Sequence, residues 1–136
     1  MSVEGAPRSV ISRLPVDRIV ELEPGRRVRV ECLVPETLWV FATHFPRFPV
    51  VPGVFILGTA AELARTLLLG EDQPGWRMVG AQRLKFRHYV RPGDRLDLDV
   101  TVTERSGDEA IAVGSASVGD VLVTSMGSLR FVRDAG

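Results

Sequence analysis

Cysteine, histidine and lysine are scarce in this chain. Its 136 residues include one cysteine, Cys32, and two histidines. A lone cysteine cannot close an internal disulfide bond, so Cys32 is expected to be a small apolar residue of the core. So few cysteines and histidines, without metal-ligand spacing, predict no metal site. The 17 basic side chains are balanced by 17 acidic ones, which argues against a nucleic-acid or membrane-surface partner.

Long apolar runs and targeting signals are also missing. No stretch approaches the roughly 20 apolar residues of a membrane span, and the first residues lack the basic-then-apolar pattern of a secretory signal. The sequence contains no internal repeat, glycine-rich phosphate loop or nucleotide motif. We therefore expect a cytoplasmic protein with a single domain over residues 1–136, of which residues 1–9 are flexible.

Most of the chain alternates apolar and polar residues with a period of two, which is typical of half-buried strands. Residues 27–32, Arg-Val-Arg-Val-Glu-Cys, follow a Glu-Pro-Gly-Arg turn signal, so residues 16–33 are predicted to form a hairpin. Four further segments show strand patterns, and turn signals such as Gly119-Asp120 separate them. They span residues 76–86, 96–103, 110–118 and 121–132.

One segment, residues 54–69, predicts a helix. Pro52 and Gly53 suit its start, and Gly70 suits its end. Apolar residues cover nearly its whole circumference, which is typical of a buried helix. The rest of the sequence offers only strands to enclose it. We therefore predict an α+β fold, in which one long curved antiparallel sheet wraps around one buried central helix.

A proline-rich segment precedes this helix. Residues 44–54 are His-Phe-Pro-Arg-Phe-Pro-Val-Val-Pro-Gly-Val, and their closely spaced prolines exclude helix or central strand. The segment resembles the His-Phe-Pro-x-x-Pro-(Val/Ile)-Met-Pro-Gly-Val motif of the β-hydroxyacyl-ACP dehydratases of fatty acid synthesis. Residues 16–25 and 85–94 resemble two further segments of that family, so the likeness covers roughly residues 14–132. It implies the hotdog fold, which has the architecture predicted above.

The chemistry of dehydration explains why such a motif is useful. A base must remove the C2 proton of the 3-hydroxyacyl thioester, a donor must stabilise the carbonyl oxygen, and an acid must protonate the departing hydroxyl. Histidine suits the base near neutral pH, and a helix N-terminus supplies unpaired N–H groups and a positive dipole end. Glycine lets the thioester oxygen approach closely. The resemblance implies that His44 is the base and the Gly53 N–H an oxyanion donor.

The sequence departs from the family at the position of its acid. The family places a Glu or Asp fourteen residues after the histidine, and this chain has Gly58 there. Glu62 lies one helical turn later on the same face of the helix. Its carboxylate is therefore a candidate catalytic acid, which would act directly or through a water molecule. Alternatively, Glu62 pairs with Arg65 or lies at a dimer seam. Thr59 is adjacent, but a hydroxyl is a poor acid.

Other residues are candidates for contact with the substrate. The candidate substrate-binding residues are Gly53, Val54, Gly58, Phe48, Phe55 and Arg87. The aromatic ones either flank an acyl tunnel or belong to the core. Arg87 lies in a basic segment, residues 83–91, which is either a docking patch for phosphopantetheine or an acidic carrier protein, or a solvated strand face. His88 in this segment is expected at the surface rather than in catalysis.

Three functions remain open from the sequence. The first is a 3-hydroxyacyl-thioester dehydratase in fatty acid or polyketide-type biosynthesis, using His44 with Glu62 or a water. The second is a non-catalytic subunit of a heteromeric hotdog dehydratase, in which a partner supplies the missing acid. The third is an acyl thioesterase with Glu62 activating water. All three imply a phosphopantetheine-linked substrate on acyl carrier protein or coenzyme A, no other cofactor, and a homodimer, heterodimer or higher oligomer.

Overall fold

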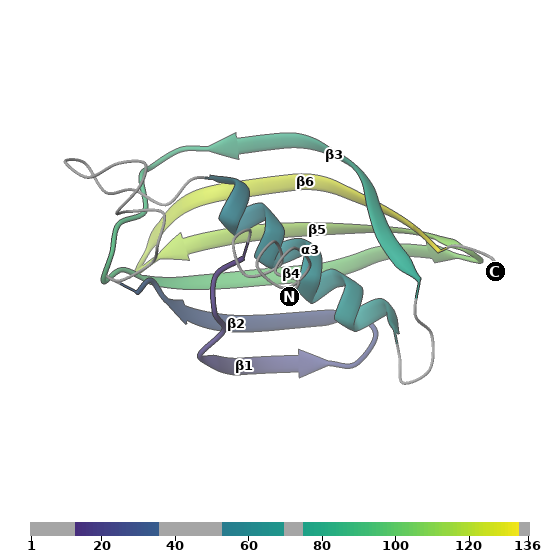
Figure 1. Cartoon of the computed structure of the whole chain (residues 1–136), viewed down its shortest axis with the longest axis horizontal. Helices are drawn as coiled ribbons and strands as arrows, with labels where there is room; N and C mark the ends of the chain where they lie inside the picture. Colours follow the sequence, from purple (N-terminus) through teal and green to yellow (C-terminus); the bar gives the residue numbers. More distant parts are fainter. Residues whose placement is uncertain (1–12, 36–52, 70–74, 134–136) are drawn as a thin grey trace, which may run out of the picture.

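The computed structural model describes residues 13–35, 53–69 and 75–133 (Figure 1). Within these ranges the elements are β1 (Arg18–Glu23), β2 (Arg27–Leu33), α3 (Gly53–Leu69), β3 (Trp76–Phe86), β4 (Arg95–Ser106), β5 (Glu109–Val118) and β6 (Val121–Arg133). The strands form one antiparallel sheet in the order β1-β2-β4-β5-β6-β3. Figure 1 shows α3 lying across one face of the curved sheet. The predicted α+β arrangement of one sheet and one helix is confirmed.

The period-two pattern sets which side of the sheet faces the helix. In β2, Val28, Val30 and Cys32 are buried, whereas the residues between them are only half-buried. A slip of one residue would reverse the two faces, so this pattern fixes the register of β2 against β4. The same alternation continues in the first half of β4. The predicted hairpins are confirmed, with Gly107 and Gly119 at φ +61° in the two turns that flank β5.

Cross-strand ion pairs cover the outer side of β1, β2 and β4. Arg27 donates two hydrogen bonds to Asp99, at 3.1 and 2.6 Å, and Arg18 donates two to Glu31, at 3.2 and 3.0 Å. The hydrogen bond with Arg18 lowers the pKa of the Glu31 carboxyl. Ion pairs at a protein surface add little to stability. They support the register more than the overall stability.

The core lies between α3 and the sheet. Leu68 on the helix, Leu96 and Leu98 on β4, and Phe131 on β6 are at most 1% exposed. Large apolar side chains buried in this way contribute about 1.5–3 kcal/mol each. Cys32 is fully buried in the same core, and burial raises the pKa of its thiol to about 12. The predicted role of Cys32 as a small core residue is confirmed.

The sheet encloses only one side of α3 in the single chain. Ala60, Ala64 and Leu68 face the core, whereas Leu57 and Ala61 are half-buried. At the first turn, Val54 is 57% exposed. Apolar residues cover nearly the whole circumference of the helix, but the described part of the chain does not cover all of them.

Candidate functional site

The start of α3 lies beside the end of β3. Gly53 is the first residue of the helix and Phe86 is the last residue of the strand, and Figure 1 shows the two ends close together. A Cβ added to Gly53 would lie 2.6, 2.8 and 2.9 Å from three carbons of the Phe86 ring. A side chain at position 53 would therefore require the Phe86 ring to move. The helix N-terminus and the Phe86 ring are therefore in contact. We call this place, between Gly53 and Phe86, the corner.

The first turn of α3 is suited to receive negative charge. Its first amide N–H groups have no partner within the helix, and the dipole is positive at this end. The first turn, which begins with Gly53 and Val54, contains no acidic side chain that would neutralise it. Gly53 is half-buried, so the corner is not closed from solvent. A thioester oxygen is the kind of acceptor that such a turn can stabilise.

The hydroxyl of Thr59 is fully used in holding the fold together. Its Oγ1 accepts a hydrogen bond from the Leu14 amide at 2.7 Å and donates one to the Phe55 carbonyl oxygen at 2.8 Å. Thr59 is 2% exposed. The hydroxyl thus ties the segment before β1 to the middle of the helix. It is not free to donate a proton to a substrate.

Glu62 is held by two arginines. Arg65 Nη1 donates to Glu62 Oε1 at 3.0 Å, and Arg13 Nη1 lies 3.4 Å from the same oxygen. Arg65 also donates from Nε to the main-chain oxygen of Trp76 at 2.7 Å. The predicted pairing of Glu62 with Arg65 is confirmed. The carboxylate of Glu62 therefore lies in an ion-pair cluster with Arg13 and Arg65.

Gly58 is half-buried in the middle of α3. One turn on, the carboxylate of Glu62 is engaged elsewhere, and the adjacent Thr59 hydroxyl has both of its partners. Both helix side chains near Gly58 therefore have partners within the described residues. The role of Glu62 as the acid stays a prediction.

The remaining predicted site residues fall in different places. His44 and Phe48 lie outside the described residues. Phe55 is 4% exposed within the core, which matches the packing alternative, and its contact with substrate stays a prediction. Arg87 directly follows β3 with an exposed side chain, and its amide donates to the Val123 carbonyl oxygen at 2.7 Å. His88 is exposed, as expected.

Sequence reasoning missed two residues of this region. Phe86 lies in residues 85–94, which resemble the family, but the sequence indicated no role for it. Because side chains alternate along a strand, Phe86 lies on the same side of the sheet as Leu84, which packs against the core. Arg13 was not considered, because nothing in its local pattern indicates a partner on the helix. Both contacts join segments that are far apart in the chain.

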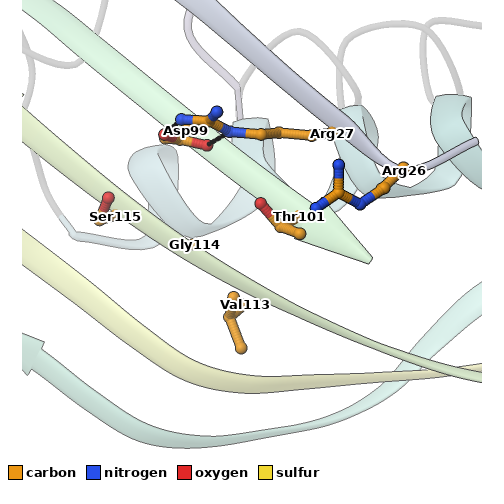
Figure 2. Close-up of a pocket in the computed structure, with 7 residues that line it drawn as sticks. All are labelled: Arg26, Arg27, Asp99, Thr101, Val113, Gly114 and Ser115. Atoms are coloured by element: carbon orange, nitrogen blue, oxygen red, sulfur yellow. Dashed lines mark hydrogen bonds and ion pairs between the residues drawn. The ribbon is translucent and has the colours of Figure 1, made fainter. Parts of the chain in front are cut away.

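An open basin of about 430 Å³ lies on the outer side of the sheet, away from the helix (Figure 2). Its lining residues are Arg26, Arg27, Asp99, Thr101, Val113, Gly114 and Ser115. Figure 2 shows Arg27 and Asp99 pointing toward one another. Arg26 forms an ion pair with Glu23, so both arginines are neutralised. None of the predicted site residues lines this basin, and we do not assign the chemistry to it.

In the described parts of the chain, no group of three or more histidine, cysteine, aspartate or glutamate side chains could hold a metal ion. In the same residues, no helix is long and apolar enough to cross a membrane.

Known proteins resemble this chain in sequence and in fold. Residues 21–124 match the sequence model of the ApeI-like family, described as ApeI dehydratase. The 3-hydroxyacyl-(acyl-carrier-protein) dehydratase FabZ of Moorella thermoacetica is 36% identical over 121 residues, which cover 87% of this chain and 84% of that protein. FabZ of an Anaeromyxobacter species is 36% identical over 127 residues, which cover 89% of this chain and 81% of that protein.

Solved structures show the same fold. The dehydratase heterocomplex ApeI:P from Xenorhabdus doucetiae matches with a TM-score of 0.72 and 22% identity, over 88% of this chain and all of that one. An uncharacterised protein, PH1136 from Pyrococcus horikoshii, matches with a TM-score of 0.70 and 18% identity, over 90% of this chain and 86% of that one. The expected hotdog fold is confirmed.

Replacing Thr59 with valine tests its structural role. The variant keeps the branched shape but leaves the buried Leu14 amide without its acceptor. We expect the free energy of unfolding, measured by chemical denaturation, to fall by about 1–3 kcal/mol. Thr66→Val is the matched control, because Thr66 makes the same bond to the carbonyl four residues earlier at an exposed position. Its effect should stay within about 0.5 kcal/mol, and equal losses in the two variants would contradict the assignment.

Proposed function

Since the chain belongs to the ApeI-like dehydratase family, we propose that it binds a 3-hydroxyacyl thioester and takes part in removing water from it. The observation that carries this proposal is the corner at the start of α3. There, a first turn without acidic residues begins at a glycine that packs directly against the Phe86 ring. The substrate is carried on phosphopantetheine, and the reaction needs no other cofactor.

His44 and Gly53 have complementary roles in the proposed reaction. The imidazole of His44 takes the C2 proton, and the electron pair of that bond moves toward the carbonyl, whose oxygen accepts a hydrogen bond from the Gly53 amide. The C2–C3 double bond then forms as the C3–O bond breaks. The hydroxyl must gain one proton to leave as water. Dehydration therefore needs an acid as well as a base.

The source of that proton distinguishes two versions of the proposal. Glycine occupies the family's acid position at Gly58, and Glu62 is paired with Arg13 and Arg65. This favours the version in which a second hotdog subunit supplies the acid to a shared site. The solved relative from Xenorhabdus doucetiae is itself described as a dehydratase heterocomplex. A homodimer in which a water delivers the proton is the alternative.

The thioesterase alternative has less support. It needs a helix carboxylate that activates a water molecule, and Glu62 was its candidate. Two guanidinium groups hold that carboxylate in an ion-pair cluster. The relatives matched by sequence are dehydratases. Release of free thiol from an acyl thioester, without loss of water, would revive this alternative.

A basic segment next to the corner suits an acidic carrier. The basic segment, residues 83–91, contains four arginine or lysine side chains and no acidic one. Within the described residues, no ion pair neutralises Lys85 or Arg87, and both are exposed. By contrast, Arg26 and Arg29 pair with Glu23 and Glu21. We therefore favour acyl carrier protein over coenzyme A as the natural carrier.

His44→Ala tests the proposed base. Turnover of a 3-hydroxyacyl thioester should fall by a factor of about 10² to 10⁴, the usual contribution of a general base. The assay follows formation of the 2,3-unsaturated thioester by the purified protein, together with any hotdog subunit that co-purifies. His88→Ala is the matched control and should keep full activity. A fully active His44→Ala protein would contradict the proposal.

Gly58→Glu tests whether the scaffold lacks only its acid. A carboxylate at this helix position restores the family's pattern, so the chain without any partner should gain dehydration by about 10²-fold or more. Gly58→Gln has the same size but cannot donate the proton, and it should show no gain. Equal rates for both variants and the unaltered chain would reject dehydration at this site.

Lys85→Gln combined with Arg87→Gln tests the carrier. The KM for substrate on acyl carrier protein should rise roughly two- to thirtyfold, because exposed charge pairs contribute about 0.2–1 kcal/mol each. The KM for the same acyl group on uncharged N-acetylcysteamine should not change. The matched variant, Arg26→Gln with Arg29→Gln, loses as much charge from the opposite sheet edge. If it weakens the carrier equally, the basic segment is not the docking site.

A further inference from the structure

Arg83, in the middle of β3, has an unusual backbone conformation. Its φ is +56°, and among the described residues it is the only one other than glycine with a positive φ. The left-handed region is unfavourable for a residue with a Cβ, because that atom approaches the following carbonyl oxygen. Such a conformation persists only where the surrounding structure holds it. Contacts around Arg83 must therefore offset its cost.

Gly127 of β6 makes these contacts. The guanidinium of Arg83 donates from Nη2 to the Gly127 carbonyl oxygen at 2.8 Å. A Cβ added to Gly127 would lie 2.7 Å from both the Cβ and the Nε of Arg83. Because the backbone of Arg83 fixes its own Cβ, rotation of the side chain cannot relieve this approach. A side chain at position 127 would therefore displace the backbone of Arg83.

The alternation of side chains in β3 shifts by one residue at this place. Ala81 lies opposite Leu129 and Leu84 lies opposite Met126, and both of these β6 residues are at most 1% exposed. Ala81 and Leu84 both pack against the core, although strict alternation would put residues three apart on opposite sides of the sheet. The shift therefore falls on the two residues between them, the second of which is Arg83.

The neighbouring strand contains a β-bulge at the same place. Two residues of β6, Gly127 and Ser128, lie opposite the single residue Val113 of β5. A bulge of this kind bends its strand and redirects the side chains that follow. The register between β3 and β6 is nevertheless unchanged on the two sides of Arg83. The left-handed conformation of Arg83 thus lets β3 follow the bulge of β6.

The shift determines which way the end of β3 faces. It places Leu84 and Phe86 on the helix side, where the Phe86 ring packs against Gly53. By the same alternation, Lys85 and Arg87 lie on the outer side, where both are exposed. A slip of one residue exchanges the two sides of a strand. Without the shift, the two basic side chains would face the helix and the ring would face solvent.

Resting on the proposed function, we infer that Arg83 is a positioning residue for docking of the acyl carrier protein. Its left-handed backbone, held against Gly127, sets the side of the sheet to which residues 84–87 point. The charges of Lys85 and Arg87 are thereby presented to the carrier. Arg83 acts through these residues and takes no part in proton transfer.

Two substitutions at position 83 test the inference. Arg83→Gly and Arg83→Val remove the same charge, but only glycine adopts a left-handed backbone readily. The readout is the KM for a 3-hydroxyacyl group on acyl carrier protein divided by the KM for the same group on N-acetylcysteamine, with any hotdog subunit that co-purifies. This ratio should rise about two- to thirtyfold in Arg83→Val, as for loss of two exposed charge pairs. In Arg83→Gly it should stay within about twofold of the unaltered protein.

Gly127→Ala tests the same contact from β6 and replaces Arg83→Val if the valine protein does not fold. It should raise the ratio in the same way, whereas a loss of stability alone would lower kcat and leave KM unchanged. Gly80→Ala is the matched control in β3, because a Cβ there meets no atom within 4 Å. In a protein that already carries Lys85→Gln and Arg87→Gln, Arg83→Val should raise the ratio no further, because it acts through those two residues.

A second readout needs no turnover. The nuclear Overhauser contact between the ring protons of Phe86 and the α-protons of Gly53 should persist in Arg83→Gly and be lost in Arg83→Val. Equal KM ratios for the two variants, or a contact that survives in Arg83→Val, would overturn the inference while leaving the proposed function intact. Failure of the unaltered protein to turn over either thioester would overturn both.

Discussion

The packing of the apolar side of α3 against the concave side of the sheet is the interaction on which the other features depend. It buries Ala60, Ala64 and Leu68 against β4 and its neighbours. Because the helix is held along its length, its first residue is fixed beside the end of β3. The corner between Gly53 and Phe86 is therefore a consequence of core packing. The position of the helix start, where the proposed reaction would take place, therefore depends on apolar contacts along the rest of the helix.

Two polar side chains of the helix make contacts that stabilise this packing. Thr59 ties the segment before β1 to the helix, and Glu62 joins Arg13 and Arg65. A chain that kept the family's helix acid would carry a carboxylate at position 58. With glycine at position 58, the proposed oxyanion donor at Gly53 is not matched by a carboxylate at the family's acid position. This imbalance is why a shared site with a second subunit is the favoured version of the function.

The sequence predicted the strands well because their pattern is periodic. The hairpin of β1 and β2 and the start of α3 at Gly53, one residue before the predicted bound, follow from local alternation and turn residues. The buried side of the helix was hard to predict, because few polar residues interrupt its apolar surface and one of them, Thr59, is itself buried. The partners of Glu62 and the contact of Phe86 with Gly53 join distant segments, and local patterns carry no information about such contacts. Resemblance alone supplied the roles of His44 and the Gly53 amide.

Nuclear magnetic resonance of the ¹⁵N-labelled protein tests the central claim most directly. The claim is that the first turn of α3 receives the thioester oxygen. Titration with an inert acyl-pantetheine should move the Gly53 amide resonance downfield, as a new hydrogen bond does, and should leave the outer basin at Asp99 and Ser115 unchanged. Shifts confined to that basin, with the Gly53 resonance unmoved at saturation, would contradict the account.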